Sequence, residues 1–271
     1  MASLFTPEQR AAYERDGFVL IRSLFDTEEI ALLRGAIETD PQLHASLYDR
    51  NDASGKATRM ATWNHPGDSV YGLAARSHRV VDTMEEMLGG EVYHYHSKLT
   101  AKEPRDGGAW EWHQDYGYWY KNQFMFPDQL VSVMIALTKA NKENGCIQVI
   151  KGSHKLGRVN HGFAGEQVGA DQTMVDNALK TMELVYVEIE PGDALFFHSN
   201  ILHRSEANLS NSPRWSIISC YSAQSNLAYN ETSTSWHTPI EKVPNEALLN
   251  WESSSLSAAD FLKKENDPAL K

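Results

Sequence analysis

The chain is poor in cysteine and in long apolar stretches, and each shortage excludes a class of protein. Its 271 residues include two cysteines, Cys146 and Cys220, too few for a disulfide framework or a zinc knuckle. Both are expected to be free thiols, as in a reducing cytoplasm. No apolar run is long enough to span a bilayer, and the first residues lack the apolar core of a signal peptide. We therefore expect a cytoplasmic protein without a membrane-spanning segment.

Positive charge is also scarce. Lys and Arg together number 25 against 36 for Asp and Glu, and the formal net charge is −11. An acidic chain without a basic cluster binds nucleic acid phosphates poorly, and it is not attracted to an anionic membrane surface. We expect neither nucleic acid nor membrane as a partner, and a small molecule as the substrate.

Predicted helices come first in the chain and predicted strands follow. Capping residues and apolar periodicity predict helices over residues 6–16, 26–40 and 78–90. Alternation and apolar density predict strands within residues 18–25, 92–104, 110–120, 130–140, 145–154, 183–200 and 214–223. Residues 41–70 are polar and predicted to be irregular, and a last helix is expected near 257–265. This order predicts an α+β fold with a β-sandwich or barrel core.

One domain, residues 1–271, is expected, with two additions to its core. Residues 156–182 are rich in glycine and lie between predicted strands, so we interpret them as an insertion that acts as a lid. A lid of this kind would be poorly ordered or open until the substrate binds. Residues 223–271 are interpreted as a polar C-terminal extension.

The stretch WEWHQDYGYWY, residues 110–120, places His113 and Asp115 two positions apart among aromatic rings. A strand alternates its faces with a period of two, so both side chains would project from one face. An imidazole and a carboxylate in that arrangement suit a borderline metal such as Fe(II), Mn(II) or Zn(II). This pair occurs often by chance, and a metal site requires a third ligand.

Two histidines further along, His198 and His203, are candidates for the third ligand. We choose His203, because Ser205 follows it by two residues and Arg214 by eleven. Arginine is suited to a planar, bidentate grip on a carboxylate. His198 is then interpreted either as a group that supports the ligands from outside or as a buried polar residue paired with the backbone.

Two histidines and one carboxylate cover three corners of an octahedron and leave three open. Such a site suits non-heme Fe(II) that binds a chelating cosubstrate and O₂ together, whereas a hydrolytic zinc site needs one open position. An arginine beside the ligands indicates a cosubstrate with a distal carboxylate, and 2-oxoglutarate fits. The residues therefore predict Fe(II), 2-oxoglutarate and O₂ as cofactors.

From about Thr6 to Tyr221 the chain resembles the phytanoyl-CoA dioxygenase family of Fe(II)/2-oxoglutarate-dependent oxygenases. The matching pieces are YERDGFVLIRSLF, WHQDY, ENGCIQVIKGSHK and EPGDALFFHSNILHRSEANLSNSPRW. The resemblance implies a double-stranded β-helix (jelly-roll) core with flanking N-terminal helices. It also implies iron ligands at His113, Asp115 and His203. For 2-oxoglutarate it implies contacts with Arg214 and Ser205, and it makes Lys98 and Tyr95 candidates. Halogenating relatives replace the carboxylate ligand by a small residue, and since Asp115 is present we expect a hydroxylase.

The substrate is the least determined part of the prediction. Rings that follow the ligands, and polar residues in the 156–182 segment, are candidates for contact with it: Tyr116, Tyr118, Trp119, Asn160 and His161. At least half of the rings around the motif are expected to fill the core instead. The HQDYGYW run also resembles bacterial 2-aminoethylphosphonate hydroxylases, and this small zwitterion is the expected substrate, with an amino acid or a natural-product intermediate as the alternative.

Two other classes of function remain open at this stage. A non-catalytic sensor of iron or 2-oxoglutarate would have lost a ligand or the arginine, and this chain keeps both. A metal-dependent hydrolase or isomerase on a jelly-roll would need neither Arg214 nor O₂.

Overall fold

The computed structural model describes residues 5–122, 126–227, 238–252 and 261–264. The α-helices are α1 Pro7–Asp16, α2 Thr27–Thr39, α3 Pro41–Ala45, α4 Val70–Arg76, α5 His78–Leu88, α6 Asp115–Trp119 and α7 Gln172–Thr181. The strands are β1 Phe18–Ile21, β2 Tyr48–Asn51, β3 Ala57–Trp63, β4 Val92–Lys102, β5 Trp110–His113, β6 Leu130–Ala136, β7 Ile147–Ile150, β8 His161–Ala164, β9 Gln167–Ala170, β10 Leu184–Val187, β11 Ala194–His198, β12 His203–Ser205, β13 Arg214–Ala223 and β14 Thr238–Pro239. Short 3₁₀ turns are η1 Tyr120–Asn122, η2 Pro127–Gln129, η3 Ser153–Leu156 and η4 Asn245–Ala247.

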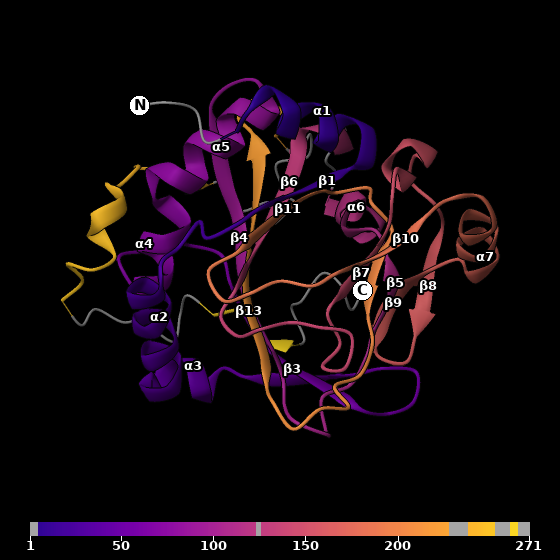
Figure 1. Ribbon diagram of the computed structural model, residues 1–271, viewed down its shortest axis with the longest axis horizontal. Coiled ribbons are helices and arrows are strands. Elements are labelled where there is room, and N and C mark those ends of the chain that lie inside the picture. The colour runs from indigo at the N-terminus through magenta and orange to yellow at the C-terminus, as the bar shows by residue number, and fades with distance from the viewer. Residues whose placement is uncertain (1–4, 123–125, 228–237, 253–260, 265–271) are drawn as a thin grey trace.

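Two antiparallel sheets form the core. The large sheet has the order β1-β11-β6-β13-β4-β3-β2, with β14 beside β4, and the small sheet has the order β10-β7-β12-β5. In Figure 1 the helices α2, α4 and α5 lie to the left of the large sheet, and the small sheet lies to its right with β8, β9 and α7. This arrangement confirms the predicted α+β fold with a double-stranded β-helix core.

Strand β6 shows how the large sheet divides the molecule into two layers. Val131, Val133 and Ile135 belong to the core shared with the N-terminal helices, whereas Met134 and Ala136 belong to the core between the sheets. Alternate residues of a strand point to opposite faces, and here both faces are covered, which explains a strand dense in apolar residues. Strand β6 is therefore buried along its whole length.

The helix boundaries agree with their sequence signals. Thr6 and Asp26 each form a capping box at the start of α1 and α2, and Gly17 ends α1 with a left-handed φ of 83°. The strands predicted within 183–200 are also present, but they lie in different sheets, β10 in the small one and β11 in the large one. Gly192, with a φ of 90°, allows this change of sheet, because a Cβ there would lie 2.2 Å from the carbonyl oxygen of Phe25.

The expectation for residues 41–70 needs correction. Residues 41–70 are not irregular, since they contain α3, β2 and β3, and β3 pairs with β4. Polar side chains concealed these strands, because β2 closes the edge of the sheet and alternates little. The helix expected near 257–265 falls largely outside the described residues.

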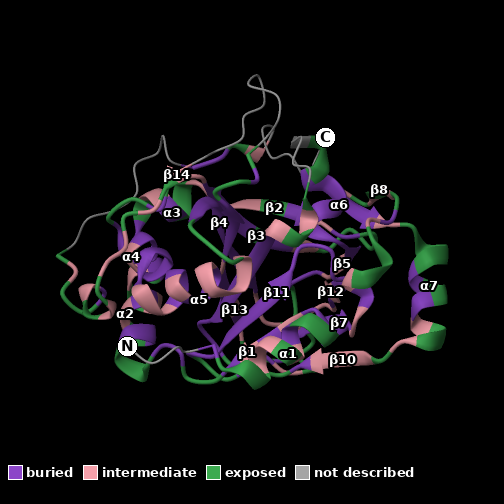
Figure 2. Ribbon diagram, turned by 90° about the horizontal axis from the view of Figure 1, so that it is seen from above, coloured by how far each residue is buried: buried purple, intermediate pink, exposed green. Residues whose placement is uncertain are grey.

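The segment 156–182 is also more regular than its glycines predict. It contains the β8–β9 hairpin and α7, which lies at the edge of the molecule in Figure 2. Gly165 lies at the hairpin turn with a φ of 63°, and a Cβ there would lie 2.5 Å from the carbonyl oxygen of Asp52. The absence of a side chain at Gly165 thus lets the hairpin turn approach the backbone of Asp52. Among the described helices, none has the length and apolar character needed to cross a membrane.

Candidate metal centre and cosubstrate pocket

The two predicted histidine ligands lie on neighbouring strands of the small sheet. His113 ends β5 and His203 begins β12, and the two residues are paired across the strands, with ring centroids 4.0 Å apart. The Nδ1 atom of His113 lies 2.8 Å from the carbonyl oxygen of Glu111, and that of His203 lies 3.0 Å from the carbonyl oxygen of Ile201. A carbonyl oxygen can only accept, so each Nδ1 carries the proton and each Nε2 keeps a lone pair. That is the tautomer in which a histidine binds a metal through Nε2.

Asp115 supplies the carboxylate, but from a different element than predicted. The strand ends at His113, and Asp115 is the first residue of α6. Its Oδ1 atom lies 3.6 Å from Nε2 of His113 and 3.9 Å from Nε2 of His203. One ligand atom from each of the three buried residues lies within 4.8 Å of the others. The predicted trio is thus brought together by a strand end and a helix start.

Gln114 explains why the strand stops between the two ligands. Its side chain is fully buried, donates to the carbonyl oxygens of Gly157 and Asn200, and accepts from the N–H of Val159. The N–H of Gln114 donates to Nε2 of His161 at 3.0 Å. These partners use every strong hydrogen-bonding group of the amide and replace the strand ladder. The chain therefore turns here and presents Asp115 beside the histidines.

The charges at the trio suit a divalent cation. Burial opposes ionisation of Asp115, but nearby groups, the Lys98 ammonium first among them, outweigh it and hold the pKa of that carboxyl well below its usual value. Burial, and then the neighbouring His113, lowers the pKa of His203 to about 3. Neutral imidazoles and an ionised carboxylate are the protonation states that metal binding requires. Two nitrogens and one oxygen, converging in a buried place, fit Fe(II).

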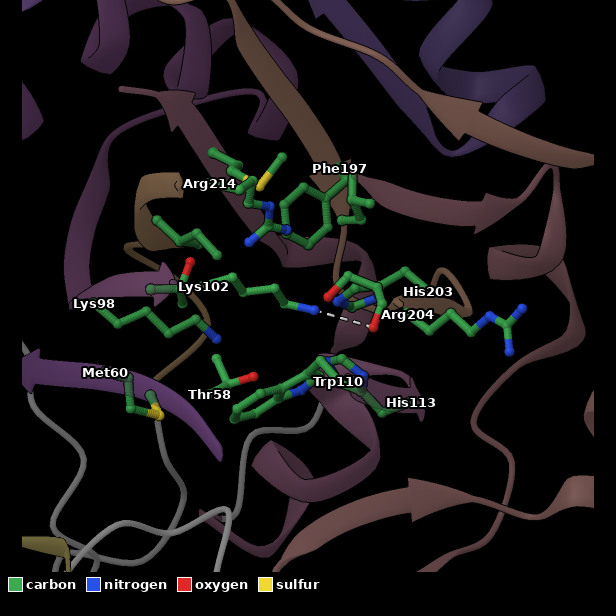
Figure 3. Close-up of a pocket in the computed structure, with 15 residues that line it drawn as sticks. Thr58, Met60, Lys98, Lys102, Trp110, His113, Phe197, His203, Arg204 and Arg214 are labelled. Atoms are coloured by element: carbon green, nitrogen blue, oxygen red, sulfur yellow. Dashed lines mark hydrogen bonds between the residues drawn. The ribbon is translucent and has the colours of Figure 1, made fainter. Parts of the chain in front are cut away.

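A pocket adjoins the histidines between the two sheets. Its lining residues are Thr58, Met60, Lys98, Thr100, Lys102, Trp110, His113, Met134, Ile147, Phe197, His203, Arg204, Ser205, Arg214 and Ile218. Figure 3 shows Lys98, Lys102 and Arg214 directed into this pocket, with His113 and His203 on its opposite side. Burial, and then the neighbouring Arg214, holds the pKa of Lys102 well below its usual value, so a second cation here is costly. Three buried basic side chains in one pocket indicate an anionic ligand.

Arg214 and Ser205 lie where the spacing from His203 predicted them to be. Arg214 begins β13 opposite Lys102 of β4, and it is 5% exposed. Burial lowers the pKa of Arg214 to about 10, so the guanidinium stays charged at neutral pH. Among the described residues no carboxylate lies within ion-pair distance of it. A buried arginine of this kind is a suitable partner for a ligand carboxylate.

Lys98 and Tyr95, the other two predicted cosubstrate contacts, are separated by the structure. Lys98 lines the pocket, whereas Tyr95 is fully buried against Trp119, with ring centroids 5.3 Å apart. The β4–β13 register shifts at Tyr95, since Tyr221 faces His94 and Cys220 faces His96. This bulge was not evident from the sequence, and it directs the tyrosine toward α6.

None of the five predicted substrate contacts lines this pocket. Tyr116 and Trp119 are buried on α6 within an aromatic cluster, and Tyr118 donates its hydroxyl proton to Asp115 at 2.7 Å. His161 binds the N–H of Gln114, and Asn160 beside it is exposed. A Cβ at Gly117 would lie 2.0 Å from the ring of His161, so this glycine lets the segment 156–182 contact α6 directly.

From the sequence, Lys102 can be interpreted as a group that binds an anionic substrate or as a solvated surface residue, and the surface position that we expected is wrong. It is 1% exposed, and its ammonium donates to the carbonyl oxygens of Ser205 at 3.2 Å and Glu206 at 2.6 Å. It thereby joins β4 to the end of β12. The signal was available, because Lys98, Thr100 and Lys102 alternate along β4 and point to one face.

His198 is a buried polar residue away from the metal ligands. Its Nε2 atom lies 3.0 Å from Oδ1 of Asp128, and its Nδ1 accepts from the N–H of Asn200 at 2.9 Å. With Nδ1 as an acceptor, Nε2 carries the proton and donates to Asp128. Both ring nitrogens are therefore used within the protein, and His203 is the histidine that points to Asp115.

The sequence resembles a known family and several named enzymes. The family described as "Phytanoyl-CoA dioxygenase (PhyH)" matches residues 13–216. An ectoine dioxygenase from Bordetella parapertussis is 26% identical over 239 residues, which cover 83% of this chain and 78% of that protein. An L-proline trans-4-hydroxylase from Streptomyces griseoviridis is 26% identical over 268 residues, covering 93% of this chain and 96% of that protein.

The structure was compared with solved structures. EctD from S. alaskensis, solved with 2-oxoglutarate and 5-hydroxyectoine, superposes with a TM-score of 0.74 at 24% identity, over 90% of this chain and 89% of that one. The carbocyclase SnoK from nogalamycin biosynthesis, described as non-heme and alpha-ketoglutarate-dependent, superposes with a TM-score of 0.69 at 20% identity, over 89% and 95%. At these identities the likeness concerns the fold.

The geometry predicts which histidine the metal needs. Replacing His203 by Ala should abolish Fe(II) binding, because one of the three buried ligands that converge is lost. His198→Ala is the matched control, and it should lower stability through the lost Asp128 bond while leaving Fe(II) affinity unchanged. Anaerobic calorimetric titration with Fe(II) measures the Fe(II) affinity of both variants. Wild-type affinity in His203→Ala together with lost affinity in His198→Ala would show that the ligand is assigned incorrectly.

Proposed function

The chain belongs to the phytanoyl-CoA dioxygenase family, and on this premise we propose that it hydroxylates a small zwitterionic metabolite. It is a 2-oxoglutarate-dependent dioxygenase that uses Fe(II), 2-oxoglutarate and O₂. The observation that carries the proposal is the charge of the pocket. Arg214 and Lys98 are buried cations without an ion-pair partner among the described residues, beside two histidines and a carboxylate that converge.

We propose the following roles for the residues of the site. His113, Asp115 and His203 hold Fe(II). Arg214 would bind the distal carboxylate of 2-oxoglutarate, and Ser205 would add a hydroxyl group. Lys98 and Tyr95 are the further contacts proposed for the cosubstrate, and of the two Lys98 has the better support, since it lines the pocket.

When bound together, iron and 2-oxoglutarate supply the oxidising chemistry, in which O₂ is consumed, succinate and CO₂ leave, and one oxygen atom enters a C–H bond of the substrate. The residues of the chain orient the bound molecules and exclude water. Apolar side chains on the pocket wall, among them Met134, Ile147, Phe197 and Ile218, keep water away from the reacting centre. The low local polarity also strengthens the grip of Arg214 on a carboxylate.

Similarity to proteins named for ectoine and for L-proline supports a small zwitterion as the substrate. 2-Aminoethylphosphonate, expected from the HQDYGYW run, belongs to the same chemical class and remains our specific candidate. We call the turn at Gln114, between His113 and Asp115, the ligand turn. The residues proposed for substrate contact lie around this turn: Tyr116, Tyr118, Trp119, Asn160 and His161. A sensor would keep the same pocket without turnover, and a hydrolase would need no Arg214.

A substrate screen tests the proposed function. Small amines, amino acids, ectoine and 2-aminoethylphosphonate would each be added to the Fe(II) enzyme with 2-oxoglutarate and O₂, and succinate measured. We expect one class of zwitterion to increase succinate formation and to gain a hydroxyl group. If no compound increases succinate formation, the sensor is favoured. If product forms without O₂, the hydrolase is favoured.

Arg214 provides a second prediction. Truncating one partner of a desolvated, hydrogen-bonded charge pair costs about 2–5 kcal/mol. Arg214→Ala should therefore raise the 2-oxoglutarate concentration needed for half-maximal turnover by roughly one to three decades, with Fe(II) affinity little changed. Arg105→Ala, at an exposed arginine, is the control and should behave as wild type. An unchanged requirement in Arg214→Ala would remove the cosubstrate assignment.

We also propose that the segment 156–182 closes over the site when substrate binds. It lies against the ligand turn, because Gln114 bonds Gly157 and Val159. Hydrogen exchange should show added protection of this segment only when substrate and 2-oxoglutarate are both present. Asn160→Ala should weaken substrate use at unchanged 2-oxoglutarate affinity, with Asn177→Ala on α7 as an exposed control. Equal exchange in all states and a silent Asn160→Ala would assign the segment to the surface.

A further inference from the structure

The carboxylate of Asp115 accepts a hydroxyl hydrogen bond on each of its two oxygens. Tyr118 donates to Oδ1 at 2.7 Å, and Ser132 donates to Oδ2 at 3.1 Å. Asp115 and Ser132 are fully buried, and Tyr118 is 5% exposed. Water therefore cannot replace either donor, and the orientation of the carboxylate depends on these two side chains.

The donors come from two separate elements. Tyr118 lies one turn after Asp115 on α6, and its ring is stacked on that of His113, with centroids 6.1 Å apart. Ser132 lies on β6, in the middle of the large sheet, on the face directed between the sheets. A rotation of the carboxylate would break both bonds, because one donor is fixed by the helix and the other by the sheet.

The Ser132 hydroxyl also lies 3.2 Å from the sulfur of Cys220, which in turn is 3.4 Å from Nε2 of His96. A hydroxyl has one proton to donate. An ionised carboxylate is a stronger acceptor than a thiol, so the proton of Ser132 goes to Asp115. The serine is thus oriented by the ligand that it binds.

The two oxygens face different neighbours. Oδ1 is the atom that lies 3.6 Å and 3.9 Å from the Nε2 atoms of His113 and His203, so it is the oxygen that faces the metal position. Oδ2 faces Ser132. A carboxylate oxygen has two lone pairs, and Oδ1 can keep its bond to Tyr118 while it binds a cation.

We propose that Tyr118 and Ser132 are positioning residues that keep Asp115 a ligand through one oxygen. A carboxylate that turned both oxygens to the metal would occupy a fourth coordination position. Two positions would then remain for a chelating cosubstrate and O₂, which need three. This inference rests on the iron and 2-oxoglutarate site proposed above, and it assigns Tyr118 to the ligand rather than to the substrate.

Two variants test the proposal, Ser132→Ala and Tyr118→Phe, each of which removes one hydroxyl. Fe(II) and then 2-oxoglutarate would be titrated anaerobically, and the visible charge-transfer band of the chelate recorded. We expect Fe(II) affinity to be kept, the band to weaken or shift, and the dissociation constant for 2-oxoglutarate to rise about 10- to 100-fold, as for the loss of a hydrogen bond to a charged group. These readouts do not depend on turnover.

Ser219→Ala and Tyr93→Phe are the matched controls. Each removes a buried hydroxyl that bonds elsewhere, Ser219 with Ser97 and Tyr93 with the carbonyl oxygen of Asn226. An unchanged band and unchanged 2-oxoglutarate affinity in both test variants, or the same loss in the controls, overturns the proposal. If Ser132→Ala does not fold, Tyr118→Phe decides alone. A wild-type protein that forms no chelate band contradicts the proposed function instead.

Discussion

The site depends on the burial of one amide side chain, that of Gln114. A buried amide must satisfy its donors and acceptor, and Gln114 does so with backbone groups of two segments far along the chain, near Val159 and at Asn200. Its own N–H goes to His161 and leaves the strand ladder. The chain therefore turns at this residue, and the turn is what places a carboxylate from a helix beside two histidines from a sheet.

The second constraint is electrostatic. Lys98, Lys102 and Arg214 are buried on the face of the large sheet that looks toward the metal ligands, and isolated buried charges are costly. Lys102 offsets part of this cost with the carbonyl oxygens of Ser205 and Glu206. Arg214 and Lys98 lack such partners among the described acidic residues. The Lys98 ammonium acts on the Asp115 carboxylate, whereas Arg214 keeps its charge without a carboxylate within ion-pair distance among the described residues, where a ligand carboxylate would bind.

Sequence reasoning selected the three residues that converge in the structure, because His113, Asp115, His203 and Arg214 form an informative combination although the first pair is common by chance. His113 and Asp115 were found through a period of two, although the structure makes that period incidental, since Asp115 belongs to α6. The choice of His203 over His198 rested on Arg214 eleven residues later, and the β12 and β13 positions explain that spacing. The positions of Tyr95 and Tyr118 were harder to predict from the sequence. The position of Tyr95 depends on a bulge in β4, and that of Tyr118 on a hydrogen bond to Asp115, and both arise only in the tertiary structure.

By itself the sequence determined the caps of α1 and α2, the layered burial of strands such as β6, and the residues able to bind iron and a carboxylate. These follow from local rules, namely capping, alternation and side-chain chemistry. The structure alone decided which strands share a sheet, that the ligand turn is held by Gln114, and that Ser132 reaches Asp115 from β6. Each of these depends on contacts between residues distant in the chain, and no local pattern encodes the partner of a buried polar group.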